Sequence, residues 1–289
     1  MPISTSKFKI RHLPKLLVKA YHNWIDTNPF ELSAIVAYYA ILSLPALIVI
    51  ILNLVGNIWG REIVQGELLD EITNAVGVQT AESIRVMMLD RGDETVSVFT
   101  TIIGFGTLLY GSTGVFYQLQ FAFDKIWKVK TTEENGIIKT IVSRIKSFGF
   151  VLIIGFLLLI SFVLTAILSA FSKRVDRLLP DNWFELVYVI DFLMSILFIY
   201  VLFAAMFKYL PSKRLRWKSV KIGAALTAIL FVIGKYVLAW YFNEMEPGST
   251  YGAAGSVILI MLWVSYSSLI LFFGAHFTKV YADTYLNIE

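Results

Sequence analysis

Long apolar runs alternate with short polar segments along almost the whole chain. A helix needs roughly 20 mostly apolar residues to cross a bilayer. Runs of that length recur six times, each interrupted by few charges. They predict six membrane-spanning helices, over residues 33–56, 96–120, 148–171, 186–207, 219–242 and 255–278.

The polar segments differ in their content of lysine and arginine. Five such residues precede the first run, three lie in the segment 57–95, and six separate the second run from the third. The next segments carry three, six (counting Lys221 at the start of the following run) and none. Because basic segments flanking membrane helices tend to stay in the cytoplasm, this alternation predicts that both termini are cytoplasmic.

Two further stretches show helical spacing outside these runs. Residues 1–32 are basic and amphipathic, and their apolar residues are too interrupted for a signal peptide. We expect a cytoplasmic interfacial helix there, with these residues toward lipid: Phe8, Ile10, Leu13, Leu16 and Leu17. In the segment 57–95, two short amphipathic helices are expected on the outer face.

Composition agrees with a lipid environment. The chain is 57% hydrophobic and 16% charged, whereas soluble domains average about 45–50% apolar and about 25% charged residues. The predicted fold class is therefore all-α, a polytopic membrane protein. We expect one integral membrane domain over residues 1–289, with the six-helix bundle spanning 33–278.

Motifs for enzymatic chemistry are missing from the sequence. There is no cysteine, no G-x-x-x-x-G-K-[ST] phosphate loop and no H-E-x-x-H zinc motif. The three histidines, His12, His22 and His276, are scattered along the chain. The sequence thus predicts no cofactor, no metal, no nucleic-acid partner and no enzymatic activity.

Lys235 and Asp191 are charged residues inside predicted spans. By helix rise they lie roughly 12 Å and 8 Å below the outer ends of their spans. A charge at the bilayer centre costs at least ~2.5–3.5 kcal/mol, so a partner or a wet cavity is expected. The two residues are candidates for an ion pair. Lys235 is also a candidate for binding an anionic headgroup in a cavity, or for snorkelling to the outer headgroups.

Pro45 lies in the middle of the first predicted span and predicts a kink, because proline removes a helical hydrogen bond. The carbonyl freed by the kink needs a polar partner or water. Tyr38, Tyr39 and Ser43 are close enough in sequence to line this break. A kink that serves only helix packing is the alternative.

The second span carries a polar face near its cytoplasmic end. Tyr110, Gly114, Tyr117 and Gln118 share that face at three- and four-residue spacings. They are candidates for lining a substrate cavity, and close helix packing through small residues explains the glycine equally well.

Three aromatic residues extend the candidate cavity toward the outer side. Tyr251 lies in a glycine-rich segment before the last span, and Trp263 and Tyr266 share one face of that span. Ordinary packing of buried aromatic residues is the alternative.

Four stretches resemble the YihY/BrkB family of bacterial inner-membrane proteins. The resemblance begins with AIVAYYAILSLPALIVIIL and continues through YGSTGVFYQLQFAFDKIW, KYLPSKRLRWKSVKIGAAL and YGAAGSVILIMLWVSYSSLILFFGAH. One departure is His276, which stands where the family usually has glutamate. The resemblance implies six spanning helices in the bacterial cytoplasmic membrane.

The resemblance implies little chemistry. Some family members are linked with export of envelope lipid or lipopolysaccharide, others with serum resistance, and an old ribonuclease label accompanies the family. From the polar span residues we hypothesise a transporter or flippase for an anionic lipid or lipid-linked envelope component, with membrane lipids as partners. The alternative is a non-transporting scaffold or regulator of an envelope-biogenesis complex. Both the transporter hypothesis and the scaffold alternative are compatible with a homo-oligomer.

Overall fold

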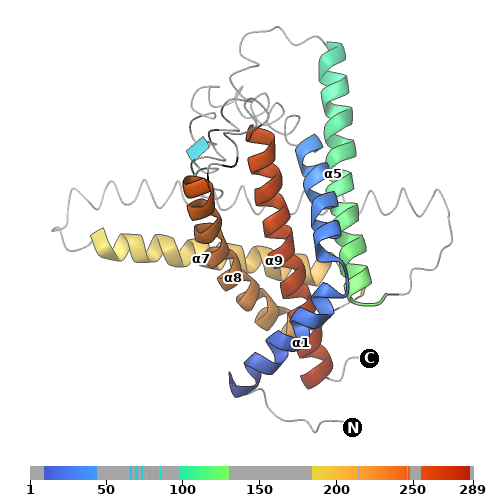
Figure 1. Ribbon diagram of the computed structural model, residues 1–289, viewed down its shortest axis with the longest axis vertical. Coiled ribbons are helices and arrows are strands. Elements are labelled where there is room, and N and C mark those ends of the chain that lie inside the picture. Colours follow the sequence, from blue (N-terminus) through green and yellow to red (C-terminus); the bar gives the residue numbers. More distant parts are fainter. Residues whose placement is uncertain are drawn as a thin grey trace. The chain divides into compact units, whose positions relative to one another are not determined.

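The computed structural model describes residues 10–43, 98–129, 184–245 apart from 214, 247 and 255–286, with seven single residues between 66 and 85. Over these ranges the chain forms helices and no strand. The elements are η1 (Ile10–His12), α1 (Leu13–Ile25), a helix over Pro29–Ser43, α5 (Val98–Ile126), α7 (Phe184–Tyr209), α8 (Trp217–Met245) and α9 (Gly255–Tyr285) (Figure 1). The predicted all-α class is confirmed for the part of the chain described.

Four predicted spans correspond to long helices. α5, α7, α8 and α9 cover the predictions for 96–120, 186–207, 219–242 and 255–278, and all but α7 run at least three residues further at their C-terminal ends. Two segments in the described ranges, Trp217–Met245 and Val257–Tyr285, are long and apolar enough to cross a bilayer. The span at 148–171 lies outside the described residues. Six spans and cytoplasmic termini stay predictions.

The helices contribute to two compact units. One comprises Met1–Asn23, Phe123–Leu230 and Phe273–Glu289, and the other comprises Trp24–Ala122 and Phe231–Phe272. We call them the first and the second unit.

In the first unit, α8 and α9 approach closely through a reciprocal pair of glycines and threonines. A Cβ atom added to Gly223 would lie 1.7 Å from Thr278 Oγ1, and one added to Gly274 would lie 1.8 Å from Thr227 Oγ1. Each threonine therefore occupies the space that a glycine of the facing helix leaves. Gly223, the earlier position in α8, meets the later position in α9, and Thr227 meets the earlier one, so these two helices are antiparallel.

The same threonines keep their hydroxyl groups satisfied. Thr227 Oγ1 donates to Gly223 O and Thr278 Oγ1 donates to Gly274 O, both at 2.7 Å. Both threonines are fully buried. Because each hydroxyl bonds the carbonyl one turn earlier in its own helix, the contact leaves neither donor unpaired in an apolar setting.

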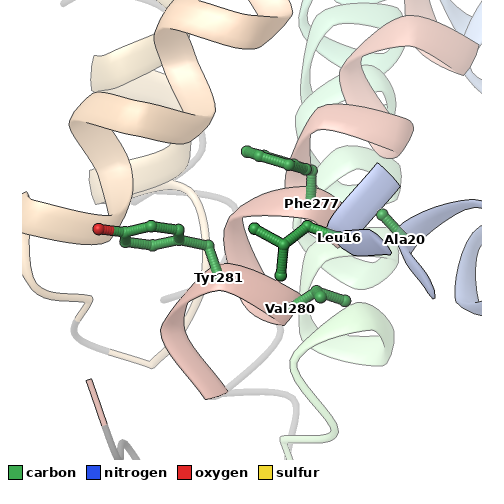
Figure 2. Close-up of a cluster of buried hydrophobic side chains, with 5 residues drawn as sticks. All are labelled: Leu16, Ala20, Phe277, Val280 and Tyr281. Carbon is green, nitrogen blue, oxygen red and sulfur yellow. The ribbon is translucent and has the colours of Figure 1, made fainter. Parts of the chain in front are cut away.

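The apolar face of α1 packs on α9. Leu16 and Ala20 are buried with Phe277, Val280 and Tyr281. Figure 2 shows the five side chains at this crossing, with the Tyr281 hydroxyl directed away from α1. Directly before α1, His12 Nδ1 forms a hydrogen bond of 2.7 Å with Tyr285 Oη at the end of α9.

This packing corrects the prediction for the N-terminal helix. Leu16 is 5% exposed, and Leu13 and Leu17 are partly buried against the same cluster. The stripe expected to face lipid is used for packing on α9 because a protein surface at close range offers more contacts than a bilayer boundary. Phe8 and the side chain of Ile10 lie outside the described residues.

The segment 57–95 is described at single positions only. Gly66, Leu69, Thr73, Glu82 and Arg85 are among seven described residues there, and all seven are helical. Arg85 Nε and Nη2 donate to the Glu82 carboxylate at 2.8 and 2.9 Å. The hydrogen bond from Arg85 lowers the pKa of the Glu82 carboxyl. These positions agree with helix in this segment, and the amphipathic character and outer-face location of the predicted helices stay predictions.

We expect Gly223→Ala to destabilise the protein by about 1–3 kcal/mol, because the new methyl group overpacks the contact with Thr278. Adding Thr278→Ala should restore part of the loss, since it removes the hydroxyl that the methyl group meets. Thermal unfolding in detergent measures both. Gly106→Ala is the matched control, since a Cβ there meets nothing within 4 Å. Equal stability of Gly223→Ala and Gly106→Ala would contradict the packing.

Candidate functional site

Tyr39 and Ser43 pack directly on α5 in the second unit. A Cβ atom added to Gly114 would lie 2.2 Å from Tyr39 Cδ1, and one added to Gly111 would lie 2.7 Å from Ser43 Cβ. Both distances are too short for any larger residue. The glycines of the polar face on α5 thus admit the ring of Tyr39 and the backbone at Ser43. Ser43 Oγ donates to Ala40 O at 2.9 Å within its own helix.

Two tyrosines of the candidate set have their side chains exposed in the same unit. Tyr38 is 56% exposed and meets Tyr39 edge to face, with ring centroids 5.4 Å apart. Tyr117 is 52% exposed and lies one turn after Gly114 on α5. Gln118, the next residue, is buried. The predicted polar face therefore divides into a packed part at Gly114 and an exposed phenol at Tyr117.

Lys235 lies at the edge between the packed and the exposed surface of α8. The residue before it, Gly234, admits Tyr266 and Ile270 of α9, because a Cβ atom added there would lie 2.8 Å from each side chain. The residue after it, Tyr236, is 61% exposed. Lys235 itself is half-buried, and its Nζ lies 5.9 Å from the centroid of the Tyr236 ring. This is within the range of a cation–π contact.

Trp263 and Tyr266, which share one helix face, both contact α8, and their place in a substrate cavity stays a prediction. Trp263 meets Phe231 edge to face at a centroid distance of 6.3 Å. Tyr266 packs on Gly234, one residue from Lys235. Both aromatic residues are half-buried.

The remaining candidates stay predictions. Pro45 and Tyr251 lie outside the described residues, and so do the side chains of Tyr110 and Asp191. The kink at Pro45 and the pair of Lys235 with Asp191 are therefore untested.

Sequence reasoning missed a buried carboxylate in the first unit. Asp124, near the end of α5, is 7% exposed. Its Oδ1 accepts from Ser212 N at 2.8 Å and its Oδ2 accepts from Ser212 Oγ at 2.7 Å. Nearby, Lys279 Nζ of α9 donates to Ile126 O at 2.6 Å. The carboxylate and the ammonium fasten the C-terminal end of α5 to the loop after α7 and to α9.

A signal for this anchor was present in the sequence. Asp124 belongs to the stretch YGSTGVFYQLQFAFDKIW and Ser212 to the stretch KYLPSKRLRW. These are two of the stretches that carry the family resemblance. An acid that directly follows an apolar run is a candidate for a buried, hydrogen-bonded carboxylate, because a charge at that place needs water or a partner. The sequence alone did not identify Ser212 as that partner.

Among the described residues, no three His, Asp or Glu side chains are grouped so that they could hold a metal ion.

Two apolar helices of membrane-spanning length that meet through small residues are features of a helical membrane protein. Residues 20–287 match the model of the family described as Virulence factor BrkB, and the chain belongs to that family. The resemblance stated from the sequence is thereby confirmed.

Relatives of the chain carry two kinds of name. A ribonuclease-like protein of Bacillus subtilis (strain 168), YfkH, is 24% identical over 250 residues, covering 84% of this chain and 86% of that protein. A UPF0761 membrane protein of Psychromonas ingrahamii is 23% identical over 247 residues, covering 84% and 79%. One of Tolumonas auensis is 31% identical over 83 residues, 28% of each chain. No solved structure matches the chain.

The absence of cysteine offers a direct test of the contact between the helix Pro29–Ser43 and α5. We expect the double variant Ser43→Cys/Gly111→Cys to form a disulfide under mild oxidation, because a small relaxation brings the two Cβ atoms to the about 3.5–4.5 Å that a disulfide needs. Mass spectrometry of a digest detects the linked peptides. Ser43→Cys/Gly106→Cys, in which the second position has open surroundings, should stay reduced. Equal cross-linking in both variants would contradict the contact.

We expect Asp124→Ala to cost about 2 kcal/mol, because it leaves the Ser212 N–H and hydroxyl without their charged acceptor. Asp124→Asn should cost less, since it keeps one acceptor oxygen. A double-mutant cycle with Ser212→Ala, measured by thermal unfolding, should give a coupling energy of roughly 0.5–3 kcal/mol. A coupling energy of zero would contradict the anchor.

Proposed function

We propose that this membrane protein of the BrkB family moves an anionic lipid or lipid-linked envelope component across the bacterial inner membrane. The proposal rests on one observation above all. Lys235 is a half-buried ammonium group ten residues before the end of α8, at the border of an exposed surface. In a helix of spanning length such a charge is expensive, and an intramembrane ionisable residue is by default a candidate for a functional site.

The surroundings of Lys235 suit a lipid headgroup. A phosphate offers the ammonium group a charge partner, and the exposed neighbours Tyr236, Val237 and Trp240 offer apolar surface to acyl chains. A lateral groove on the surface, rather than a closed pore, is the route that fits an amphipathic substrate.

The role proposed is not enzymatic. In this scheme the exposed phenols of Tyr38 and Tyr117 donate hydrogen bonds to the polar part of the substrate. The name ribonuclease-like belongs to the Bacillus relative, and the proposal does not carry it over to this chain. A gradient, a partner protein or a downhill concentration difference drives the movement.

We expect purified protein in vesicles to accelerate the transfer of fluorescent phosphatidylglycerol between leaflets, measured by quenching of the outer leaflet. Lys235→Leu should slow the transfer about ten- to a hundredfold, because a charge-assisted hydrogen bond contributes about 1.5–3 kcal/mol. Lys235→Arg should retain most of it. Lys221→Leu, the same change at an exposed position near the start of α8, is the control.

Vesicles with protein that behave like empty vesicles, across several anionic and zwitterionic lipids, would refute transport. Full function of Lys235→Leu and Asp191→Leu in cells, together with a stoichiometric partner on purification, would favour the scaffold alternative.

A further inference from the structure

α1 has three distinct faces rather than the two of an ordinary amphipathic helix. Leu16 and Ala20 form the face buried on α9. A second face is apolar yet exposed, with Val18 57% and Tyr21 52% exposed. Since the burial of an apolar stripe normally drives a helix onto its protein, a second such stripe on the same helix needs a separate explanation.

The spacing of the exposed residues defines two parallel stripes. Pro14, Val18 and Tyr21 follow one another at intervals of four and three residues, which keeps them on one face. Lys15, Lys19 and His22 repeat the same intervals one residue later, and all three are exposed. One residue corresponds to a turn of about 100° around the helix. The basic stripe therefore borders the exposed apolar stripe, and neither coincides with the face on α9.

The segment that carries these stripes has charges of a single sign, and Asp283 of α9 is the acid whose charge interacts with Lys19. Residues 1–25 contain five lysine and arginine residues and neither aspartate nor glutamate. Arg11, in η1 directly before α1, is exposed as well. An apolar stripe bordered by basic residues is complementary to a bilayer surface, where acyl chains lie beneath anionic phosphates. Each basic side chain near such a surface adds to the attraction toward anionic lipid.

We propose that the second face of α1 lies in the surface of the bilayer and recruits anionic phospholipids. Val18 and Tyr21 enter the boundary between headgroups and acyl chains, and Arg11, Lys15 and Lys19 bind the phosphates. This is a different face from the Leu13, Leu16 and Leu17 stripe that the sequence predicts for lipid. α1 thus connects α9 to the membrane surface, and it holds a layer of anionic lipid at the first unit.

Because the chain has no cysteine, single-cysteine variants of the full chain report on each face without background. Nitroxide labels at Val18→Cys, Tyr21→Cys, Lys15→Cys and Lys19→Cys are compared after reconstitution into vesicles of phosphatidylcholine with a minority of phosphatidylglycerol. Relaxation by oxygen reports lipid contact, and relaxation by a water-soluble nickel chelate reports water contact. We expect labels at 18 and 21 to favour oxygen several-fold, and labels at 15 and 19 to favour nickel.

The contribution of charge is tested separately. Changing Lys15 and Lys19 together to glutamine, or omitting phosphatidylglycerol, should make the label at position 18 several-fold more accessible to nickel. Thermal unfolding checks that the variants stay folded, and Tyr21→Cys supplies a second reporter of the same face.

Two results would overturn the proposal. Labels at 18 and 21 that are as accessible to nickel as those at 15 and 19 would show that the face lies in water. Labels at 18 and 21 shielded from both reagents would show that protein covers the face, either a second copy of the chain or a partner.

Discussion

The close approach of helix backbones is the constraint on which the rest of this structure depends. In lipid, apolar side chains gain little by leaving one apolar surface for another, so helices associate through dispersion contacts and through small residues that let backbones meet. Thr227 and Thr278 each fill the gap above a glycine of the facing helix. Their hydroxyl groups bond carbonyls of their own helices. The contact is therefore both dense and free of an unsatisfied donor at either threonine.

The same device recurs where the candidate functional residues lie. Gly111 and Gly114 of α5 admit Ser43 and Tyr39, and Gly234 of α8 admits Tyr266. Each glycine fixes which side chain of the facing helix packs against it. The residue next to a packed position then lies at the edge of the helix contact, as Tyr38 does beside Tyr39 and Lys235 does beside Gly234. The packing of these neighbours thus fixes the helix face on which the polar groups proposed to meet a substrate lie.

Much of the helical content was predictable from the sequence, because the length of a hydrophobic run indicates directly a long apolar helix such as α8 or α9. Trp263 and Tyr266 were placed on one face by spacing alone. The face used by α1 was not predictable, since Leu16 and Val18 are equally apolar and only the position of α9 decides between them. Asp124 was missed for a related reason. Its partner, Ser212, is 88 residues away, and no local pattern relates two such positions.

The pairing of His12 with Tyr285 has a consequence for how the protein is made. The two residues are 273 positions apart, and Leu16 finds its binding surface on the same late helix. Domains emerging from the ribosome fold from the N-terminal side first, but the residues of α9 that bury Leu16 are among the last of the chain to be synthesised. The leucine face of α1 therefore stays without this partner during most of translation. Its packing on α9 is a late step of folding rather than an early one.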